Sequence, residues 1–324
     1  MATYLVTGCA GFIGSHLTES LLDDGHTVVG IDAFTSFYDR ALKERNLAGP
    51  IARDEFRLVE FDLATPDRRL ERAVAEADVV FHLAAQSGVR TSWGDSFADY
   101  VRGNLLATQH VLEASARAEV RVVLASSSSV YGTITGGATR ESAALRPISP
   151  YGVTKLSGEQ LATAYTENFG LDVVRLRYFT VFGPRQRPDM AFTRIAAALL
   201  DGKPFEVFGS GEQSRDFTYV TDAVSATVLA GRRAPPGAVY NVGGGEEATL
   251  NRVLDLFQQL ADRPLEIVRT GAMSGDVRRT SADTSAVRSD CSWLPRVSLR
   301  DGLQAQLQWY AGLRAEYDAT ARIS

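Results

Sequence analysis

Tyr151 and Lys155 stand four residues apart, just after Ser149 and Pro150. In a helix this spacing places both side chains on one face, and proline is tolerated in the first helical turn. A phenol has a pKa of about 10, and a nearby ammonium lowers it because the ammonium favours the phenolate. A lowering of roughly 3 units needs about 4 kcal/mol, which Lys155 and a second cation, such as an oxidised nicotinamide, could supply. The pair therefore predicts a catalytic base, and the alternative is an exposed Tyr/Lys pair on an amphipathic helix.

Three glycines, Gly8, Gly11 and Gly14, separate a predicted strand at 4–7 from a predicted helix that runs to residue 22. This spacing lets backbone N–H groups approach a pyrophosphate at the helix N-terminus. A second predicted strand, 27–32, ends in Asp32. A carboxylate there can bind the ribose hydroxyls of adenosine and would repel a 2′-phosphate, so we expect NAD rather than NADP. The alternative for Asp32 is a turn residue at a strand end.

The alternation of strands and helices continues through the first half of the chain. Further strands are predicted at 56–61, 78–85, 121–125 and 172–177, and a long helix is predicted at 96–118. This rhythm predicts an α/β fold with a doubly wound parallel sheet of the Rossmann-like kind. Ligands of such sheets bind outside the carboxyl ends of the strands. Six candidate residues fall at those ends: Gly8, Asp32, Asp62, Ala84, Ser127 and Tyr178.

The rhythm changes at about Phe182, where glycine and proline residues interrupt it. The later elements are shorter, with strands predicted at 205–208 and 239–242 and helices at 221–231, 249–260 and 299–313. We therefore predict a NAD-binding Rossmann-like domain at 1–181, to which segments near 215–245 return. Residues 182–324 are predicted to form mainly a smaller, interleaved α/β domain for the substrate.

The composition excludes several classes of protein. The 324 residues are 45% hydrophobic and carry a formal net charge of −5, with no long basic run, so a nucleic-acid partner is not expected. No apolar stretch reaches the ~18 residues of a membrane span, and the N-terminus lacks the basic region of a signal peptide. The two cysteines and four histidines show no metal-ligand spacing. We expect a cytoplasmic protein with free thiols and no metal.

Several motifs together resemble the extended short-chain dehydrogenase/reductase family, the nucleotide-sugar epimerases and dehydratases, over nearly the whole chain. They are Thr7-Gly8-x-x-Gly11-Phe12-Ile13-Gly14, Asp62-Leu63, His82-Leu83-Ala84-Ala85-Gln86, Asn104, 126–132, Tyr151-x-x-x-Lys155, Arg177-Tyr178-Phe179 and Arg215-Asp216-Phe217-x-Tyr219-Val220. Within the family, the stretch 177–191 is most similar to UDP-glucuronate 4-epimerases. UDP-galactose 4-epimerases usually carry asparagine where Thr180 stands.

The resemblance implies a reaction in which the C4 hydroxyl of UDP-glucuronate is inverted to give UDP-galacturonate. Tyr151 would take the proton of that hydroxyl, Lys155 would stabilise the phenolate and hold the nicotinamide ribose, and Ser127 would share the hydrogen-bond network. Hydride would pass to NAD and return to the other face of a 4-keto sugar, without net redox change. The implied cofactor contacts are Gly8, Gly11, Phe12, Ile13, Gly14, Asp32, Lys43, Asp62, Leu63, Leu83, Ala84, Ala85, Gln86, Asn104, Tyr151, Lys155, Tyr178 and Val181.

Ser128 and Ser129 are informative because dehydratases of this family carry an Asp-Glu pair at this place, and related decarboxylases carry a glutamate. Without a carboxylate there, an elimination at C5–C6 lacks its proton carrier. We expect the hydroxyls of Ser128, Ser129 and Thr180 to hold the uronate carboxylate in a geometry that disfavours loss of CO₂.

The diphosphate of the substrate requires cations, and a guanidinium fork fits phosphate oxygens. The candidates are Arg187, Arg215 and Arg278, of which Arg215 matches the phosphate arginine of the family. The resemblance further places Asp276 at the uridine ribose, Arg90 at the sugar and Lys43 on the adenosine side. The alternative for each of these cations is an exposed surface residue.

Two other functions remain open from the sequence. One is 4-epimerisation of a neutral UDP-sugar, such as UDP-glucose, UDP-galactose or their N-acetyl forms. The other is a catalytically idle NAD-binding regulator, which would tend to lose the set formed by Ser127, Tyr151 and Lys155, whereas this chain retains it. In relatives the two long helices, here those after Ser96 and at Tyr151, pair across a dimer, so we expect a homodimer.

Overall fold

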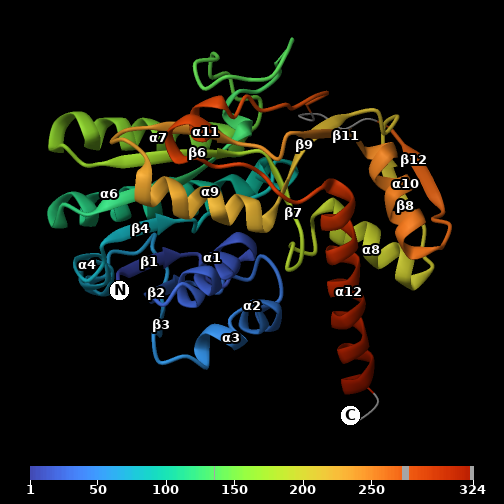
Figure 1. Cartoon of the computed structure of the whole chain (residues 1–324), viewed down its shortest axis with the longest axis horizontal. Coiled ribbons are helices and arrows are strands. Elements are labelled where there is room, and N and C mark those ends of the chain that lie inside the picture. Colours follow the sequence, from blue (N-terminus) through green and yellow to red (C-terminus); the bar gives the residue numbers. More distant parts are fainter. Residues whose placement is uncertain (135, 272–276, 322–324) are drawn as a thin grey trace.

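Figure 1 shows the computed structural model, which describes residues 1–134, 136–271 and 277–321. Its larger sheet has seven strands in the order β10-β6-β5-β4-β1-β2-β3, and all six neighbouring pairs are parallel. The strands are β1 (Thr3–Thr7), β2 (Thr27–Asp32), β3 (Phe56–Glu60), β4 (Val79–His82), β5 (Arg121–Ser127), β6 (Val173–Tyr178) and β10 (Val239–Val242). The predicted parallel, Rossmann-like α/β sheet is therefore confirmed.

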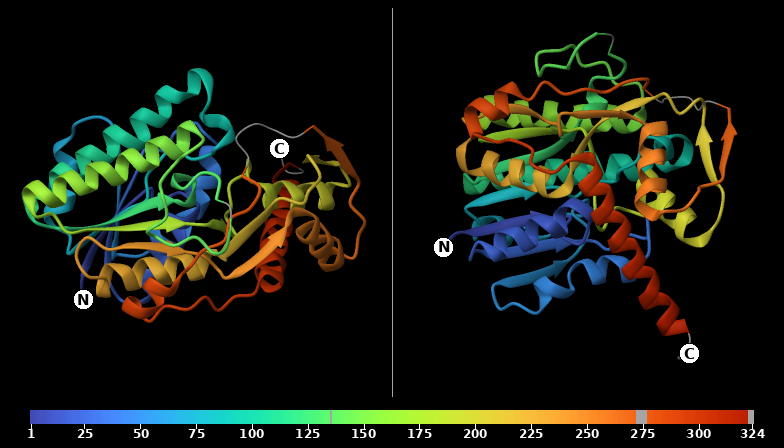
Figure 2. Two further views of the ribbon diagram at one scale, coloured as in Figure 1. Left: turned by 90° about the horizontal axis from the view of Figure 1, so that it is seen from above. Right: turned by 45° about the vertical axis from the view of Figure 1, so that its right-hand side comes forward.

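Helices cover both faces of this sheet, as Figure 2 shows from above. One face carries α1 (Phe12–Asp23), α9 (Val220–Arg233) and α11 (Ser285–Cys291), and the other carries α4 (Arg68–Ala75), α6 (Ala107–Ala118) and α7 (Pro150–Phe169). Because both faces are covered, the central strands read as almost continuous apolar runs. Leu5, Val80 and Val122 pack toward the α6 side, whereas Val6, Phe81 and Val123 pack toward the α1 side.

The predicted helix at 96–118 consists of three consecutive segments in the structure. They are α5 (Phe97–Tyr100), one π-helical turn η3 (Val101–Leu106) and α6. Smaller elements connect the strands: α2 (Arg40–Asn46), α3 (Ala48–Ile51) and the short 3-10 turns η1 (Arg90–Ser92), η2 (Gly94–Ser96) and η4 (Ser128–Val130). A π-turn in a helix often marks a functional place, and this one contains Asn104, a predicted cofactor contact.

Helix α7 begins as its sequence predicts. The side chain of Ser149 accepts a hydrogen bond from the backbone N–H of Gly152 at 3.1 Å, which caps the helix, and Pro150 occupies the first turn. The helix ends at Gly170, whose φ of 68° is left-handed. The Ser149 cap and Pro150 fix the first turn of α7, where Tyr151 lies.

The rest of the chain forms a smaller unit to the right of the large sheet in Figure 1. One small sheet has the order β11-β9-β7 and another pairs β12 with β8. Around them lie three helices that share one apolar core. The elements are β7 (Thr180–Phe182), β8 (Phe205–Phe208), β9 (Ser214–Tyr219), β11 (Glu246–Thr249), β12 (Ile267–Thr270), α8 (Ala191–Asp201), α10 (Leu250–Ala261) and α12 (Leu299–Ala321).

The chain passes between the two units more than once. β10 and α9 belong with the large sheet, β9 belongs to a small sheet, and α11 returns to pack against α9 and β10. The predicted domain boundary between 181 and 182 stays a prediction. Among the described residues, no helix is long and apolar enough to cross a membrane.

Candidate active site

The crevice of a doubly wound sheet lies where the strand order reverses, and here this point is between β1 and β4. Gly8, directly after β1, has a φ of +71°, and a Cβ at this position would lie 2.8 Å from the backbone nitrogen of Ala84. Thr7 fastens the same junction, since its Oγ1 accepts a hydrogen bond from the Ala84 N–H at 3.1 Å. Only glycine allows the two loops to approach so closely.

Gly14, the third glycine of the loop, allows helix α1 to pack closely against the loop. A Cβ on Gly14 would lie 2.1 Å from the carbonyl oxygen of Gly8, and one on Gly11 would lie 3.2 Å from the same oxygen. Phe12, the first residue of α1, is buried in the core, and Ile13 is half-buried in the same helical turn. Such a cradle, which a side chain would fill, fits the pyrophosphate of a dinucleotide at a helix N-terminus.

Asp32 lies at the end of β2, next to this loop. Its carboxylate accepts hydrogen bonds from the backbone N–H groups of Ala10 at 3.0 Å and Phe34 at 2.8 Å. Burial raises the pKa of Asp32, while these hydrogen bonds and the charge of Lys43 lower it. The structure thus brings Asp32 and Lys43 together, and their role at the adenosine stays a prediction. The Lys43 ammonium is buried and donates to the carbonyl of Thr35 at 2.6 Å.

The loop after β4 is held in place by Asn104. This buried side chain accepts from the N–H of Gln86 at 2.8 Å and donates to the carbonyl of Gln86 at 3.0 Å and to Thr154 at 2.9 Å. The segment 83–86, which contains the four predicted contacts Leu83 to Gln86, is half-buried along the crevice. Asn104 therefore positions the crevice wall with all its amide hydrogen bonds made inside the protein.

Other predicted cofactor contacts are buried or paired with another side chain. The hydroxyl of Tyr178 lies 2.6 Å from that of Thr227 in the core, where burial raises its pKa, and Val181 and Leu63 are also buried. Asp62 pairs with Arg102 at 2.6 Å. The Tyr178 hydroxyl is thus paired in the apolar interior, and a cofactor contact of this residue stays a prediction.

Ser127 and Tyr151 meet at the carboxyl end of β5. The Ser127 Oγ accepts from the backbone N–H of Ser129 and donates to the Ser129 Oγ, both at 3.1 Å. Burial raises the pKa of the Tyr151 phenol, whereas a hydrogen bond with Ser127 and the charge of Arg187 lower it. The predicted catalytic serine and tyrosine are therefore direct neighbours.

Tyr100 supports the Tyr151 ring from α5. The two rings meet edge to face, with centroids 6.2 Å apart and an interplanar angle of 75°. The Tyr100 hydroxyl is itself held by Thr91 at 2.6 Å and by the carbonyl of Gly88 at 2.8 Å. Tyr100 is a positioning residue that the sequence did not single out, although it precedes the Asn104 motif by one helical turn.

Lys155 follows Tyr151 by about one turn of α7, as its spacing predicts. Its ammonium donates a hydrogen bond to the backbone carbonyl of Ala125 at 3.0 Å, and burial lowers its pKa to about 8 while Glu159 acts to raise it. The cation that lowers the Tyr151 pKa in this arrangement is Arg187. The role of Lys155 in stabilising the phenolate stays a prediction, and in this structure its ammonium is bound to the strand carbonyl.

The predicted substrate residues differ in their burial and in their partners. Ser128, Ser129 and Thr180 are half-buried, and Thr180 pairs in register with Phe217 of β9. Arg187 is held by both oxygens of Asp189, each at 2.9 Å. Its charge lowers the pKa of Tyr151, and its role at a phosphate stays a prediction.

The remaining cations lie on the side of the smaller unit. The guanidinium of Arg90 stacks on the ring of Phe208, 4.8 Å from its centroid. Arg215 donates to the carbonyl of Ser214 at 2.8 Å, and Arg278 is exposed, with its backbone carbonyl bound to the N–H of Ser214 at 3.0 Å. Asp276 lies outside the described residues.

A buried ion pair behind Ser127 was not foreseen from the sequence. Glu159 and Arg177 approach to 2.6 Å, and both side chains are almost fully buried. Ser126 donates to the same carboxylate at 2.5 Å, and Arg177 also donates to the Tyr131 hydroxyl at 2.8 Å. The available signal was that Glu159 follows Lys155 by one helical turn and so shares its face of α7.

Asp216 is a second buried carboxylate with a positioning role. It accepts from the backbone N–H groups of Gly245 at 3.0 Å and Ala282 at 2.9 Å. It thereby joins β9 to two loops beside Arg215. His82 is likewise structural, lying between the hydroxyls of Thr7 at 2.8 Å and Thr108 at 3.0 Å. Within the ranges described, no group of three or more His, Cys, Asp or Glu residues could hold a metal ion.

The parallel sheet, the glycine cradle and the Ser127–Tyr151 contact define a dinucleotide-binding protein of the Rossmann-like α/β class. Residues 4–243 match the NAD dependent epimerase/dehydratase family, and the chain belongs to this family. NAD is thus confirmed as the cofactor, as the carboxylate at the end of β2 predicted.

Similar proteins match almost the whole chain. An uncharacterized UDP-glucose epimerase of Bacillus subtilis, YtcB, is 43% identical over 95% of this chain and 98% of its own. A UDP-glucuronate 4-epimerase of Thermodesulfobacterium geofontis is 34% identical over 95% of this chain and 96% of its own. The crystal structure of UDP-glucuronic acid 4-epimerase from Bacillus cereus with UDP-glucuronic acid and NAD superimposes with a TM-score of 0.93, at 41% identity, covering 96% of this chain and 99% of that one.

Proposed function

We propose that this protein inverts the configuration at C4 of UDP-glucuronate and so interconverts it with UDP-galacturonate. The observation that carries the proposal is the full-length similarity, at 41% identity, to a crystal structure that holds UDP-glucuronic acid and NAD. The local chemistry agrees, since Ser129 is hydrogen-bonded to Ser127, and the hydroxyl-bearing residues Ser128, Ser129 and Thr180 are all half-buried.

The first chemical task of the protein is to move the proton of the C4 hydroxyl. Tyr151 accepts it, with Ser127 as hydrogen-bond partner, and Arg187 favours the phenolate through its charge. When bound, NAD supplies a positively charged ring that accepts the C4 hydride and returns it to the opposite face of the 4-ketone. Tyr151 then returns the proton to the new hydroxyl, so that the protein ends each cycle in its initial state.

Residues for the cofactor follow from the geometry of the crevice. Gly8, Gly11 and Gly14 would cradle the pyrophosphate, and Asp32 with Lys43 would hold the adenosine ribose. For Lys155 we propose a bond to the nicotinamide ribose, which requires its ammonium to leave or share the Ala125 carbonyl.

The second task is to keep the carboxylate of a β-keto acid intermediate from leaving as CO₂. Hydroxyls at 128, 129 and 180 can bind the carboxylate without supplying a charged acid or base. Arg215, Arg90 and Arg278 are proposed for the diphosphate and sugar, along the side of the smaller unit. Replacing Thr180 by Ala or Asn tests the carboxylate role, since it should release more CO₂ and weaken the preference for the uronate.

The test of the reaction is direct. The purified protein with NAD and UDP-glucuronate, without added reductant, should give UDP-galacturonate, identified by the C4 proton couplings in NMR spectra. A 4-keto or pentose product, or no product, would contradict the proposal.

A neutral UDP-sugar is the second candidate substrate, because YtcB, at 43% identity, carries the name of a UDP-glucose epimerase. The same NMR assay with UDP-glucose and UDP-N-acetylglucosamine distinguishes the two. A higher kcat/KM for either neutral sugar than for UDP-glucuronate would assign the protein to the second function.

We further propose a cytoplasmic homodimer that pairs through α5 and α7. Four large apolar side chains that are 39–53% exposed line one shallow hollow at this face: Trp93, Phe97, Ile148 and Val153. Light scattering at micromolar concentration should show a dimer. Val153→Glu should give monomers, whereas the control Val268→Glu, at a similarly exposed valine on β12, should not. A monomeric wild type would exclude this interface.

A further inference from the structure

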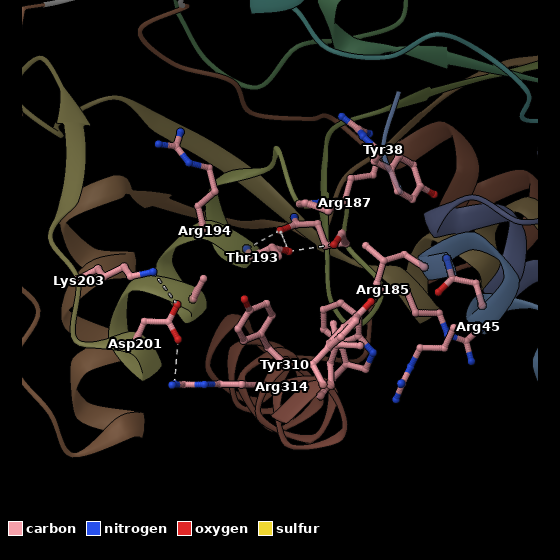
Figure 3. Close-up of a pocket in the computed structure, with 18 residues that line it drawn as sticks. Tyr38, Arg45, Arg185, Arg187, Thr193, Arg194, Asp201, Lys203, Tyr310 and Arg314 are labelled. Atoms are coloured by element: carbon pink, nitrogen blue, oxygen red, sulfur yellow. Dashed lines mark hydrogen bonds and ion pairs between the residues drawn. The ribbon is translucent and has the colours of Figure 1, made fainter. Parts of the chain in front are cut away.

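A cavity of 580 Å³ lies outside the catalytic centre, and we name it the interdomain cavity (Figure 3). It is bounded by α2 and the loop 185–188 on one side and by α8 and α12 on the other. Neither Ser127, Tyr151 nor Lys155 lines it. Its volume falls in the usual range of small-molecule sites, about 300–1,000 Å³.

One wall of the interdomain cavity is an aromatic stripe on α12. Trp309, Tyr310, Leu313 and Tyr317 recur at helical spacing, so they share one face of the helix. Figure 1 shows that this end of α12 extends beyond the body of the protein. Trp309 and Tyr310 remain only half-buried, which leaves planar apolar surface available to a ring.

The opposite wall holds two buried donors without a matched acceptor. Among the described residues, neither the Tyr38 Oη nor the Arg185 Nη1 has a hydrogen-bond partner. The other terminal nitrogen of Arg185 is fixed by Glu19 at 2.8 Å, and burial raises the pKa of Tyr38, so its hydroxyl stays protonated. A buried polar group without a hydrogen-bond partner is unfavourable. Both atoms have almost no accessible surface, so a ligand oxyanion can accept from them only when the two side chains turn toward the cavity.

Cations outnumber carboxylates among the side chains that line the cavity, and five of the six cations pair with an acid. Six cationic side chains, Arg45, Arg185, Arg187, Arg194, Lys203 and Arg314, line the cavity with a single carboxylate, that of Asp201. At the rim, Arg45 of α2 pairs with Glu316 of α12 at 2.7 Å. This pair is exposed and contributes little stability, so Arg45 can turn to a bound anion at small cost.

We propose that the interdomain cavity is a second ligand site, which binds a nucleoside phosphate. Its phosphate would accept from Tyr38 and Arg185, and its base would pack on the α12 stripe beside Trp309. A phosphate offers more acceptor oxygens than a carboxylate to these donors and to Arg45, and the aromatic wall requires a planar group that inorganic phosphate lacks.

Hydrogen bonds connect α12 and α8, which line the cavity, to the loop that carries Arg187. Gln186 is buried and accepts from Gln306 of α12 at 2.8 Å and from the Thr193 N–H of α8 at 3.2 Å. The next residue is Arg187, whose charge lowers the pKa of Tyr151. A ligand that contacts α12 and Arg185 thus acts on the loop that carries Arg187, and binding at the two sites is coupled reciprocally.

Fluorescence tests the site, because Trp309 is one of only three tryptophans in the chain. The enzyme is saturated with NAD and UDP so that the catalytic crevice is filled, and then titrated with UMP and, separately, with AMP. Inorganic phosphate and uridine serve as the two half-ligands. We expect saturable quenching by a nucleotide, weaker binding of either half-ligand, and no quenching in Trp309→Phe.

Two variants locate the binding. Tyr38→Phe removes only the unpartnered hydroxyl, so it should keep thermal stability and weaken the nucleotide by about tenfold, the loss of one hydrogen bond to a charged group. Arg194→Gln is the control: Arg194 lines the cavity but points away from it, toward the Phe205 ring (Figure 3), and its loss should change affinity much less.

Several outcomes would overturn the inference. They are an absence of saturable quenching at millimolar nucleotide, equal affinity in wild type and Tyr38→Phe, or a Trp309 signal that follows protein concentration, which would assign the stripe to a second copy. The fluorescence reads binding and not turnover, so the outcome is independent of the substrate proposed above.

Discussion

The ammonium of Lys155 donates a hydrogen bond to the backbone carbonyl of Ala125 at 3.0 Å. Ala125 lies on β5, two residues before the predicted catalytic Ser127. Burial makes the charged form costly, and the pKa of Lys155 falls from 10.5 to about 8. The protein thus holds a desolvated cation at neutral pH, one turn of helix after Tyr151.

This relationship predicts how stability depends on pH. Because the folded pKa lies below the unfolded one, the unfolded chain binds more protons between about pH 8 and 10.5, so this residue raises stability as pH rises through that window. Lys155→Met removes the titration. Its unfolding free energy relative to wild type should therefore fall by about 3 kcal/mol from pH 8 to 10.5.

Denaturant unfolding without added nucleotide, at several pH values, measures that difference. A matched control is Lys203→Met at an exposed lysine, which should show no such trend. If the difference between Lys155→Met and wild type stayed constant over this pH window, the lysine would not be desolvated.

The contact of Ser127 with Tyr151 predicts the largest kinetic effects. Tyr151→Phe removes the proton acceptor and should lower kcat by about 10²–10⁴-fold, the usual contribution of a positioned acid or base. Ser127→Ala should lower kcat less, since a water can replace the hydroxyl. Both variants should retain NAD, measured by its absorbance after gel filtration. Turnover by Tyr151→Phe at the wild-type rate would exclude its role as the base.

The sequence predicted the large sheet well because its strands are buried on both faces. Apolar runs such as 27–32 and 121–125 are distinct from the helical periodicity between them, and all seven strands were found within a few residues. The strands of the smaller unit were harder. β9 reads Ser-Arg-Asp-Phe-Thr-Tyr and β11 reads Glu-Glu-Ala-Thr. These polar segments are strands because they pair with each other and, for β9, also with β7.

The candidate site shows the same limit. Glycine spacing and Asp32 were readable because the chain is continuous there, and the structure places them as expected. The hydrogen-bond partner of Lys155 and the pair formed by Glu159 and Arg177 could not be read from the sequence. Both depend on how α7 lies across β5 and β6. Tyr178 illustrates the converse case: its strand-end position was correct, but its hydroxyl turns into the core toward Thr227.

The buried pair behind Ser127 predicts a strong effect on stability. Glu159→Gln leaves the guanidinium of Arg177 buried without its counter-charge, which typically costs about 3–5 kcal/mol. Glu60→Gln is the matched control, because Glu60 pairs with Arg40 at 2.8 Å on the exposed surface, and its loss should change little. Chemical denaturation at pH 7 compares the two variants. Equal, small losses in both would mean that the buried pair is not electrostatically important.

Gly14 gives the sharpest test of the cofactor cradle. A Cβ there would lie 2.1 Å from the carbonyl oxygen of Gly8, so Gly14→Ala must move α1 away from the loop and should abolish tight binding of NAD. Gly158→Ala is the control in a helix with room, since its Cβ would come no closer than 3.8 Å to the Thr108 side chain. That variant should keep its affinity for NAD. Its free energy of unfolding should rise by up to about 1 kcal/mol, because alanine is the better helix former. Calorimetric titration of nucleotide-free protein with NAD measures both, and unchanged affinity in Gly14→Ala would mean that this loop does not hold the pyrophosphate.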